Sequence, residues 1–256
     1  MELVVMESPA FDVASFVSSL NLASFAVLRG AQRQVCTHCG SRKMIYCDKC
    51  QRLLVGRDEV PSLELPLQVH IFKHIAERSS KSSVIPLAFL CPNSVTITTC
   101  MPNDKAIPAY SPADTVLIFP SPGARLLQDL SEVEFTAIRR VVVIDSTWGQ
   151  TTSMVSSAHL QSLPALRLQD YTTIFWRQQS ESKDFLSTVE ALYYFLREYV
   201  TEQQKRGLRT EAYHGELDNL LWHFVYTYEL IQGEYKSGRK KGKTFKKDPE
   251  YIQEER

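Results

Sequence analysis

The chain lacks a net charge, a long apolar run and a basic N-terminus, and each absence excludes a class of protein. Its 256 residues carry 29 Lys and Arg against 29 Asp and Glu, so the formal net charge is zero. A nucleic-acid partner must therefore be held by local basic patches. No apolar run approaches the roughly 18 residues needed to cross a membrane. Glu2 and Glu7, with no early Lys or Arg, argue against a secretory signal.

These absences predict a protein of the nucleus or the cytoplasm that is not secreted and binds no membrane. In that setting the six cysteines are expected to stay reduced, with Cys91 and Cys100 as ordinary buried thiols. A content of 44% hydrophobic and 23% charged residues is ordinary for a globular protein. A chain of this length suits one main domain with a small module, and we expect a monomer.

One segment stands out, a run of four apolar residues at 141–144 that ends at Asp145. Three of the four are valine, which predicts a strand buried on both faces. An unpaired buried carboxylate costs several kcal/mol, so local preference alone does not explain Asp145. Asp145 is either the N-cap of a following helix, the commoner case, or a group that meets a ligand at the carboxyl edge of the sheet.

The rest of the chain alternates between strand and helix patterns. Strands are predicted at 67–72, 84–90, 95–99, 115–119, 140–145 and 165–168. Helices are predicted at 125–137, 149–160, 187–204 and 216–231, and one or two short ones between 10 and 30, with Pro9 at the start and Gly30 at the end. Such alternation indicates an α/β fold with a mostly parallel sheet and helices on its faces. The basic, apolar-poor residues 236–256 predict a disordered tail.

Four cysteines form two C-x-x-C pairs, Cys36 with Cys39 and Cys47 with Cys50. Two such turns can supply the four thiolates of a tetrahedral zinc site. The alternatives are two reduced thiol pairs in a core or a redox pair, but the segment is polar and would make a poor core. With four protein ligands a zinc ion has no open position, so it would stabilise the fold or shape an RNA-contacting knuckle.

Asp145-Ser146-Thr147-Trp148 matches a D-x-T-W signature, and other segments accompany it in order: 36–50, 117–121 and 186–191. On these motifs, residues 34–232 resemble the DTW-domain family, the tRNA- and rRNA-uridine aminocarboxypropyltransferases. The segment 213–221 resembles the eukaryotic tRNA-modifying branch. The resemblance implies a fold similar to the SPOUT methyltransferases, with a trefoil-knotted cofactor site, although base rates run against a knot.

The resemblance also implies an activity. The family moves the 3-amino-3-carboxypropyl group of S-adenosylmethionine onto a uridine, here N3 of a uridine in the tRNA D-loop at or next to position 20, and releases 5′-methylthioadenosine. Asp145 is the candidate catalytic base. The implied cofactor-binding residues are Phe119, Pro120, Ser121, Gly123, Thr147, Trp148, Leu186, Ser187, Thr188 and Glu190. The alternatives are a SPOUT-type RNA methyltransferase and a non-catalytic, zinc-containing RNA-binding protein.

Several of these motifs also have a purely structural interpretation. The residues 119–123 resemble an ordinary turn after a strand. Ser187 followed by Glu190 is a capping box, although a helix N-terminus also suits the carboxylate of S-adenosylmethionine. Trp148 either packs under the sheet or stacks on a base.

Basic side chains follow the predicted strand at 67–72. Lys73, His74, Arg78 and Lys81 are the candidate contacts to the tRNA phosphates, and a solvated loop is the alternative. With the resemblance, the chain divides into an N-terminal helical segment (1–33), a zinc module (34–58), a catalytic domain (59–235) and the basic tail (236–256).

Overall fold

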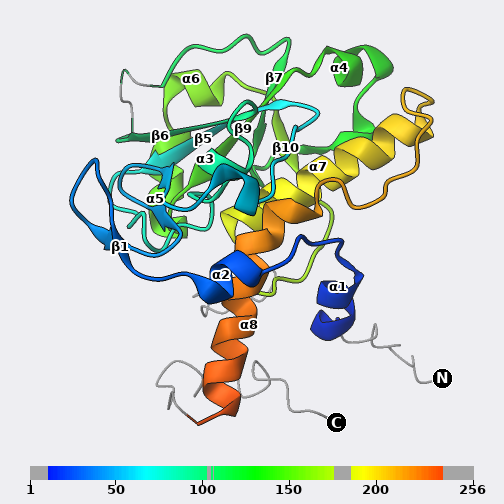
Figure 1. Cartoon of the computed structure of the whole chain (residues 1–256). Coiled ribbons are helices and arrows are strands. Elements are labelled where there is room, and N and C mark those ends of the chain that lie inside the picture. Colours follow the sequence, from blue (N-terminus) through cyan, green and yellow to red (C-terminus); the bar gives the residue numbers. More distant parts are fainter. Residues whose placement is uncertain (1–10, 103–104, 106, 176–185, 239–256) are drawn as a thin grey trace, which may run out of the picture.

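The computed structural model describes residues 11–102, 105, 107–175 and 186–238, without the side chain of Trp148. A six-stranded sheet in the order β6-β5-β9-β7-β10-β8 lies at its centre, and each neighbouring pair is parallel (Figure 1). The strands are β5 (Gln68–His74), β6 (Val95–Cys100), β7 (Thr115–Ile118), β8 (Arg125–Leu126), β9 (Arg140–Asp145) and β10 (Ala165–Arg167). The predicted α/β fold with a mostly parallel sheet is confirmed.

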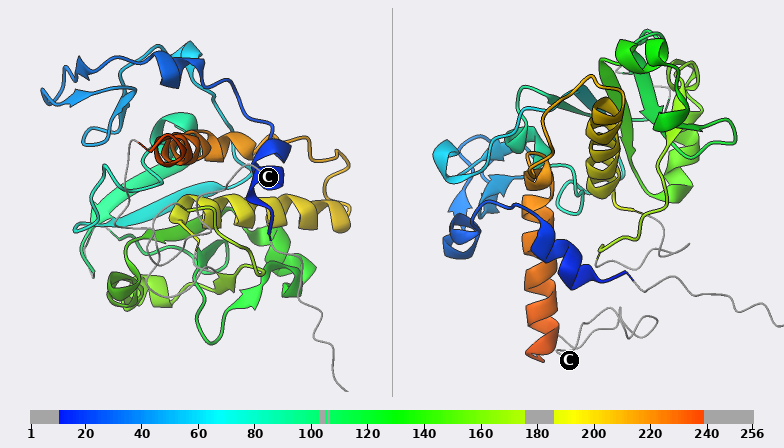
Figure 2. Two further views of the ribbon diagram at one scale, coloured as in Figure 1. Left: turned by 90° about the horizontal axis from the view of Figure 1, so that it is seen from below. Right: turned by 90° about the vertical axis from the view of Figure 1, so that its right-hand side faces the viewer.

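Helices cover both faces of the sheet, and Figure 2 shows α8 and α7 between the N-terminal part of the chain and the strands. The helices of the main body are α3 (Leu87–Leu90), α4 (Glu132–Ala137), α5 (Trp148–Val155), α6 (Ala158–Gln161), α7 (Thr188–Lys205) and α8 (Trp222–Lys236). Three short 3-10 turns are η1 (Arg57–Glu59), η2 (Leu127–Asp129) and η3 (Asp218–Leu221). No helix in the described ranges is both long and apolar enough to cross a membrane.

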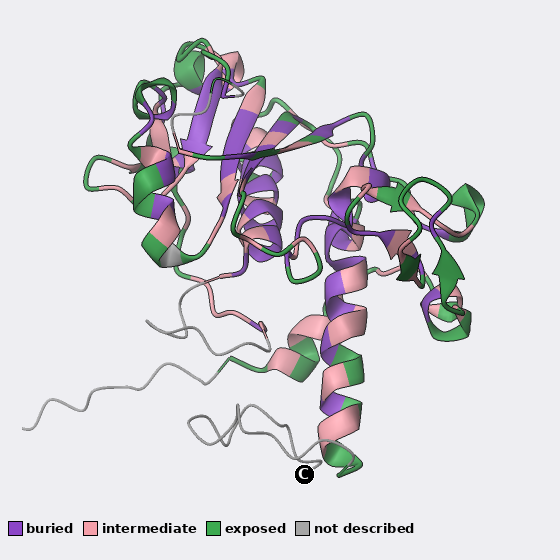
Figure 3. Ribbon diagram, turned by 90° about the vertical axis from the view of Figure 1, so that its left-hand side faces the viewer, coloured by how far each residue is buried: buried purple, intermediate pink, exposed green. Residues whose placement is uncertain are grey.

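The central strand β9 is buried on both faces, as its run of valines predicts. Val141 and Val143 pack into the larger core together with α7 and α8, whereas Val142 packs into a smaller core with Met154 of α5 and Leu160 of α6. All three valines are at most 3% exposed. Each buried side chain of this size contributes about 1.5–3 kcal/mol. Figure 3 shows this burial concentrated in the central strands and the helices that face them.

The predicted strand at 84–90 is wrong. Val84 and Ile85 are buried, but the chain turns at Pro86 into the short helix α3. Proline has no N–H to give to a central sheet ladder, whereas the first turn of a helix leaves that N–H unbonded in any case. The apolar run reflects burial of a helical turn on all sides.

The predicted helix at 125–137 is wrong over its first half. Arg125 and Leu126 form β8 at the edge of the sheet, and a 3-10 turn follows. The helix α4 begins only after Ser131, whose backbone N–H donates to Glu134 Oε2 at 2.8 Å while the Glu134 N–H donates to Ser131 Oγ at 3.3 Å. This capping box fixes where the helix starts.

The four paired cysteines lie on two small hairpins. The first joins β1 (Gln34–Val35) to β2 (Arg42–Lys43), and the second joins β3 (Tyr46–Cys47) to β4 (Arg52–Leu53). Gly40 closes the first turn at a φ of +70°, which glycine adopts without strain. The Tyr46 ring anchors the hairpins on the main body, at 5.1 Å from Phe89 and 5.2 Å from His223.

The N-terminal helices are short, as predicted. They are α1 (Val13–Ser19) and α2 (Ala26–Gly30). Asp12 caps α1 by accepting from the N–H groups of Ala14 and Ser15, so this helix begins at Val13, four residues after Pro9. The helix α8 ends at Lys236, the first residue of the predicted disordered tail (236–256), and the part of that tail beyond residue 238 lies outside the described residues.

Candidate active site

The candidate site lies where the parallel strands β5, β7 and β9 end. Asp145 is the last residue of β9 and pairs in register with Lys73 of β5. On the other side of β9, the chain leaves β7 through Phe119. Loops at the carboxyl ends of neighbouring parallel strands meet at one edge of a sheet, where open α/β folds bind their ligands.

Asp145 is 4% exposed and its two oxygens accept hydrogen bonds from different segments. Ser82 donates its hydroxyl to Oδ2 at 2.7 Å, and Thr188 donates its hydroxyl to Oδ1 at 2.8 Å. The N-cap of α5 is Thr147, so the interpretation of Asp145 as a helix cap is wrong. The carboxylate is fixed in orientation between the loop after β5 and the start of α7.

A second bond joins the same two segments. The backbone N–H of Val189, in the first turn of α7, donates to Ser83 Oγ at 3.2 Å. Ser82 and Ser83 thus tie the loop after β5 to both Asp145 and α7. This role differs from both interpretations of the segment from its sequence, which are phosphate contact and a solvated loop. The feature in the sequence that could have indicated this role is the pair of adjacent serine hydroxyls in the segment that follows the strand at 67–72.

Glu190 is fully buried, 1% exposed, and its carboxylate binds residues that precede it in the chain. It accepts from the Ser187 N–H at 2.8 Å, as the predicted capping box requires, and also from the Ser187 hydroxyl at 2.7 Å. It also accepts from the Thr173 hydroxyl and the Ile174 N–H, both at 2.8 Å. Burial raises the pKa of Glu190, and these donors oppose that rise. The carboxyl therefore positions the segment 173–174 against the start of α7.

The other predicted cofactor residues surround this edge of the sheet. After β7 the chain turns tightly, with the Ser121 N–H donating to the Phe119 carbonyl and the Ala124 N–H to the Ser121 carbonyl, both at 2.9 Å. Phe119 is half-buried against the smaller core, and Leu186 is half-buried against the larger one. The remaining members of the set, exposed in the described chain, are Pro120, Gly123 and Thr147. The side chain of Trp148 lies outside the described atoms.

The predicted phosphate contacts do not lie together on the surface. Lys73 is 2% exposed, and its ammonium donates to the carbonyls of Glu77 at 2.7 Å and His74 at 3.3 Å. The sequence predicts that Lys73 follows the strand, whereas β5 runs to His74 and buries Lys73 within it. Arg78 and Lys81 are exposed, as expected, and His74 is half-buried.

The four cysteines of the hairpins meet at one point. The sulfur atoms of Cys36, Cys39, Cys47 and Cys50 all lie within 4.8 Å of one another, and those of Cys39 and Cys47 are 3.5 Å apart. Zn–S bonds of about 2.3 Å in a tetrahedron place sulfur atoms about 3.8 Å apart. The donor set and its spacing therefore fit a zinc ion. Cys91 and Cys100 are buried elsewhere, as expected.

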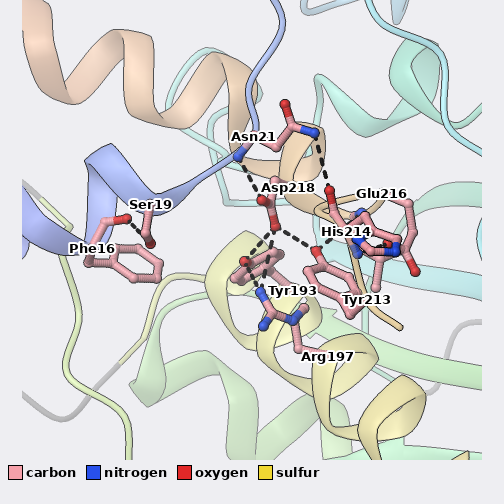
Figure 4. Close-up of polar contacts among 10 residues, drawn as sticks. Phe16, Ser19, Asn21, Tyr193, Arg197, Tyr213, His214, Glu216 and Asp218 are labelled. Atoms are coloured by element: carbon pink, nitrogen blue, oxygen red, sulfur yellow. Dashed lines mark hydrogen bonds and ion pairs between the residues drawn. The ribbon is translucent and has the colours of Figure 1, made fainter. Parts of the chain in front are cut away.

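The segment 213–221 holds the N-terminal segment in place (Figure 4). Asp218, 3% exposed, accepts from the Asn21 N–H at 2.8 Å and from the hydroxyls of Tyr193 and Tyr213. The Arg197 guanidinium lies 3.8 Å from the centre of the Tyr213 ring. The motif that resembles the tRNA-modifying branch therefore holds the N-terminal segment around Asn21 in this structure, and we call this set of contacts the clamp on the N-terminal segment.

Further contacts extend this clamp along the chain. Asn219 accepts from the Ala23 N–H at 2.8 Å, and the Trp222 indole donates to the carbonyl of Ala23 at 3.1 Å. Cavities of about 360 and 310 Å³ lie along the same face of α7, each lined by Phe16, Tyr193 and Arg197. Neither lining includes Asp145 or its hydroxyl partners.

Comparison with known proteins adds to this geometry. The DTW domain profile matches residues 44–232. The chain is 34% identical to tRNA-uridine aminocarboxypropyltransferase 1 of Mus musculus, over 88% of this chain and 86% of that protein. The protein of the same name from Homo sapiens is also 34% identical over the same shares, and that from Xenopus laevis is 30% identical over 88% and 90%.

One solved structure is also similar. It is the SAM-dependent rRNA:acp-transferase Tsr3 from Vulcanisaeta distributa, with a TM-score of 0.39 and 16% sequence identity, covering 67% of this chain and 84% of that one.

Proposed function

The chain belongs to the DTW-domain family, and on that premise we propose that it transfers the 3-amino-3-carboxypropyl group of S-adenosylmethionine to N3 of a uridine in the tRNA D-loop, at or next to position 20. That the chain is a transferase follows from its relatives, which are named as aminocarboxypropyltransferases. The observation that carries the proposed mechanism is the buried Asp145 carboxylate, held by two hydroxyls at the carboxyl edge of the sheet.

The residues at this edge suit S-adenosylmethionine. Phe119 and Leu186 offer half-buried apolar surface of the kind on which an adenine packs. The helix α7, 18 residues long, begins at Thr188, two residues after Leu186, and the positive end of its dipole favours the methionyl carboxylate. When bound, S-adenosylmethionine supplies a carbon activated by the neighbouring sulfonium, and its departing part is 5′-methylthioadenosine.

Asp145 addresses the difficult half of this reaction, the uridine. N3 carries a proton at neutral pH, and it becomes a nucleophile only as that proton leaves. We assign Asp145 as the acceptor of the N3 proton while the bond from N3 to the aminocarboxypropyl carbon forms, the carbon–sulfur bond breaks and the electron pair of that bond passes to sulfur. General base catalysis of this kind contributes about 10²–10⁴-fold.

Ser82 and Thr188 position this carboxylate and do not take part in the proton transfer themselves. Each hydroxyl donates to a different oxygen of the carboxylate, so both oxygens are held in place. The two donors belong to different segments, the loop after β5 and the start of α7. A small movement of either segment would therefore turn the carboxylate. Glu190 holds the start of α7 in place through its hydrogen bonds with Ser187, Thr173 and Ile174.

The exposed Arg78 and Lys81 follow β5, next to the loop that binds Asp145. We propose that they and His74 bind tRNA phosphates beside the target uridine. The four cysteines would hold one structural zinc ion, which stabilises the hairpins and leaves no coordination site for a substrate.

The remaining expectations stand as proposals whose support is the resemblance. They are a SPOUT-like knotted domain at 59–235 behind a zinc module at 34–58, a monomeric state and a place in the nucleus or the cytoplasm.

Product analysis tests the proposed reaction. Purified protein, unmodified tRNA and S-adenosylmethionine should yield 5′-methylthioadenosine together with an aminocarboxypropyl uridine, located by nuclease digestion and mass spectrometry. S-adenosylhomocysteine as the product would instead show methyl transfer. Release of neither product, with tRNA still bound, would favour a non-catalytic RNA-binding protein.

A further inference from the structure

The hairpins that carry the four paired cysteines expose charge of one sign. Residues 33–52 contain five Lys and Arg and one acidic residue, Asp48. Asp48 is 8% exposed and forms an ion pair with Lys43, so its negative charge is not available on the surface. The exposed charged side chains of this stretch are all cationic: Arg33, Arg42, Lys49 and Arg52.

We call these four residues the basic hairpin face. Within the described chain, none of their four side chains makes a hydrogen bond, an ion pair or a ring contact. Exposed cations elsewhere are often neutralised; Arg125, for example, binds Glu134 at 2.6 Å. In a molecule whose formal net charge is zero, the basic hairpin face is a local excess of positive charge.

The same hairpins expose apolar side chains beside these cations. Val35 is 56% exposed and Met44 is 41% exposed. Contacts between Tyr46 and both Phe89 and His223 hold the hairpins on the main body. The basic hairpin face is therefore presented in a fixed place.

That place is apart from the candidate active site. Both panels of Figure 2 show the hairpins across α8 from the central sheet, whose β9 ends at Asp145. A single nucleoside bound beside Asp145 would not extend to the hairpins, so one ligand that contacts both must be a macromolecule. A nucleic acid is long enough to contact both places, and the phosphates that repeat along its backbone attract unpaired Lys and Arg.

We propose that the basic hairpin face binds the phosphate backbone of the tRNA substrate, at a distance from the uridine that is modified. This inference rests on the proposed function and adds a second contact region to it. Arg42, Lys49 and Arg52 would set the affinity for tRNA and its register on the enzyme, whereas Asp145 would act on the base. Phosphate contacts of this kind position a nucleic acid without reading its sequence.

The test uses the full chain and a triple variant, Arg42→Ala with Lys49→Ala and Arg52→Ala. Its matched control is Arg125→Ala, which removes an exposed cation from β8. The Kd for an unmodified tRNA transcript is measured from 0.05 to 0.3 M KCl. Each lost phosphate contact should weaken binding about fivefold to tenfold near 0.1 M salt and lower the salt slope by about 0.7–0.9. The KM for tRNA should rise in parallel, with kcat and the affinity for S-adenosylmethionine unchanged.

Zinc content and a thermal melt confirm that the variant is folded. A Kd and salt slope equal to those of wild type and of Arg125→Ala would overturn the inference while leaving the proposed function intact. The inference would also be wrong if the variant lost binding to phosphatidylserine vesicles but kept its affinity for tRNA. If instead tRNA binding weakened as expected but wild type transferred no aminocarboxypropyl group, the surface would stand and the proposed function would fail.

Discussion

Replacing Asp145 by Asn keeps the shape of the side chain and removes its negative charge and most of its basicity. In wild type, Ser82 and Thr188 both donate to the carboxylate. In the variant, one hydroxyl can still donate to the amide oxygen, and the other can rotate to accept from the amide N–H. Hydrogen bonds to charged groups contribute about 1.5–3 kcal/mol against about 0.5–1.5 kcal/mol for neutral ones. The loss over two bonds is therefore about 2 kcal/mol.

The variant also avoids the cost of burying a charge, which opposes that loss. We expect the free energy of unfolding to change by about 1 kcal/mol or less. Turnover should nevertheless fall by about 10²–10⁴-fold, because the base for the N3 proton is gone. The measurement is 5′-methylthioadenosine release with unmodified tRNA, beside a thermal melt and a titration with S-adenosylmethionine.

Two further variants separate basicity from positioning. Thr188→Val and Ser82→Ala each leave Asp145 in place with one donor fewer, so kcat should fall by less than in Asp145→Asn and the pH profile of kcat should shift. Thr201→Val, on an exposed position of the same helix α7, serves as the control. A folded Asp145→Asn protein that binds the co-substrate and turns over at nearly the wild-type rate would refute the catalytic role.

Three other outcomes follow from the structure. Cys47→Ser should release zinc and unfold the hairpins, since structural zinc binding is folding free energy; elemental analysis that finds no stoichiometric zinc in wild type would contradict this. Burial and the neighbouring Arg140 lower the pKa of His70 to about 4, so the unfolded chain takes up a proton first as the pH falls below about 6.5. Stability should then drop by about 2 kcal/mol between pH 6.5 and 4, after allowance for partial solvent exposure, and urea titrations of His70→Gln should lack this drop. Asp218→Ala should cost about 2–4 kcal/mol and expose residues 11–28 to limited proteolysis, because two tyrosine hydroxyls and the Asn21 N–H lose their acceptor.

The strand that is buried on both faces could be predicted from the sequence. The run 140–145 was predicted with the bounds of β9, because a strand covered on both faces selects apolar residues at every position. The run 84–90 has a similar composition but forms a buried turn of helix. Burial on all sides gives the same residue pattern in both cases, and only Pro86 distinguishes them.

The partners of the site could not be predicted, because they are distant along the chain. Ser82 and Thr188 are separated from Asp145 by 63 and 43 residues, and no spacing rule connects them. The clamp on the N-terminal segment is more remote still, since Asp218 and Asn21 are 197 residues apart. The capping box of Ser187 and Glu190 was predictable because it is local.

The clamp between the two ends of the chain has a consequence for synthesis of the protein. The N-terminal segment leaves the ribosome early, yet its acceptor at Asp218 emerges 197 residues after Asn21. At about 5–20 residues per second, that interval is roughly 10–40 s. During this time the apolar side of α2, including the buried Leu28, has no final partner on α8. The order of translation thus makes docking of α8 a late step in maturation, and nascent chains that stop before residue 218 would leave the N-terminal segment exposed to proteases and chaperones.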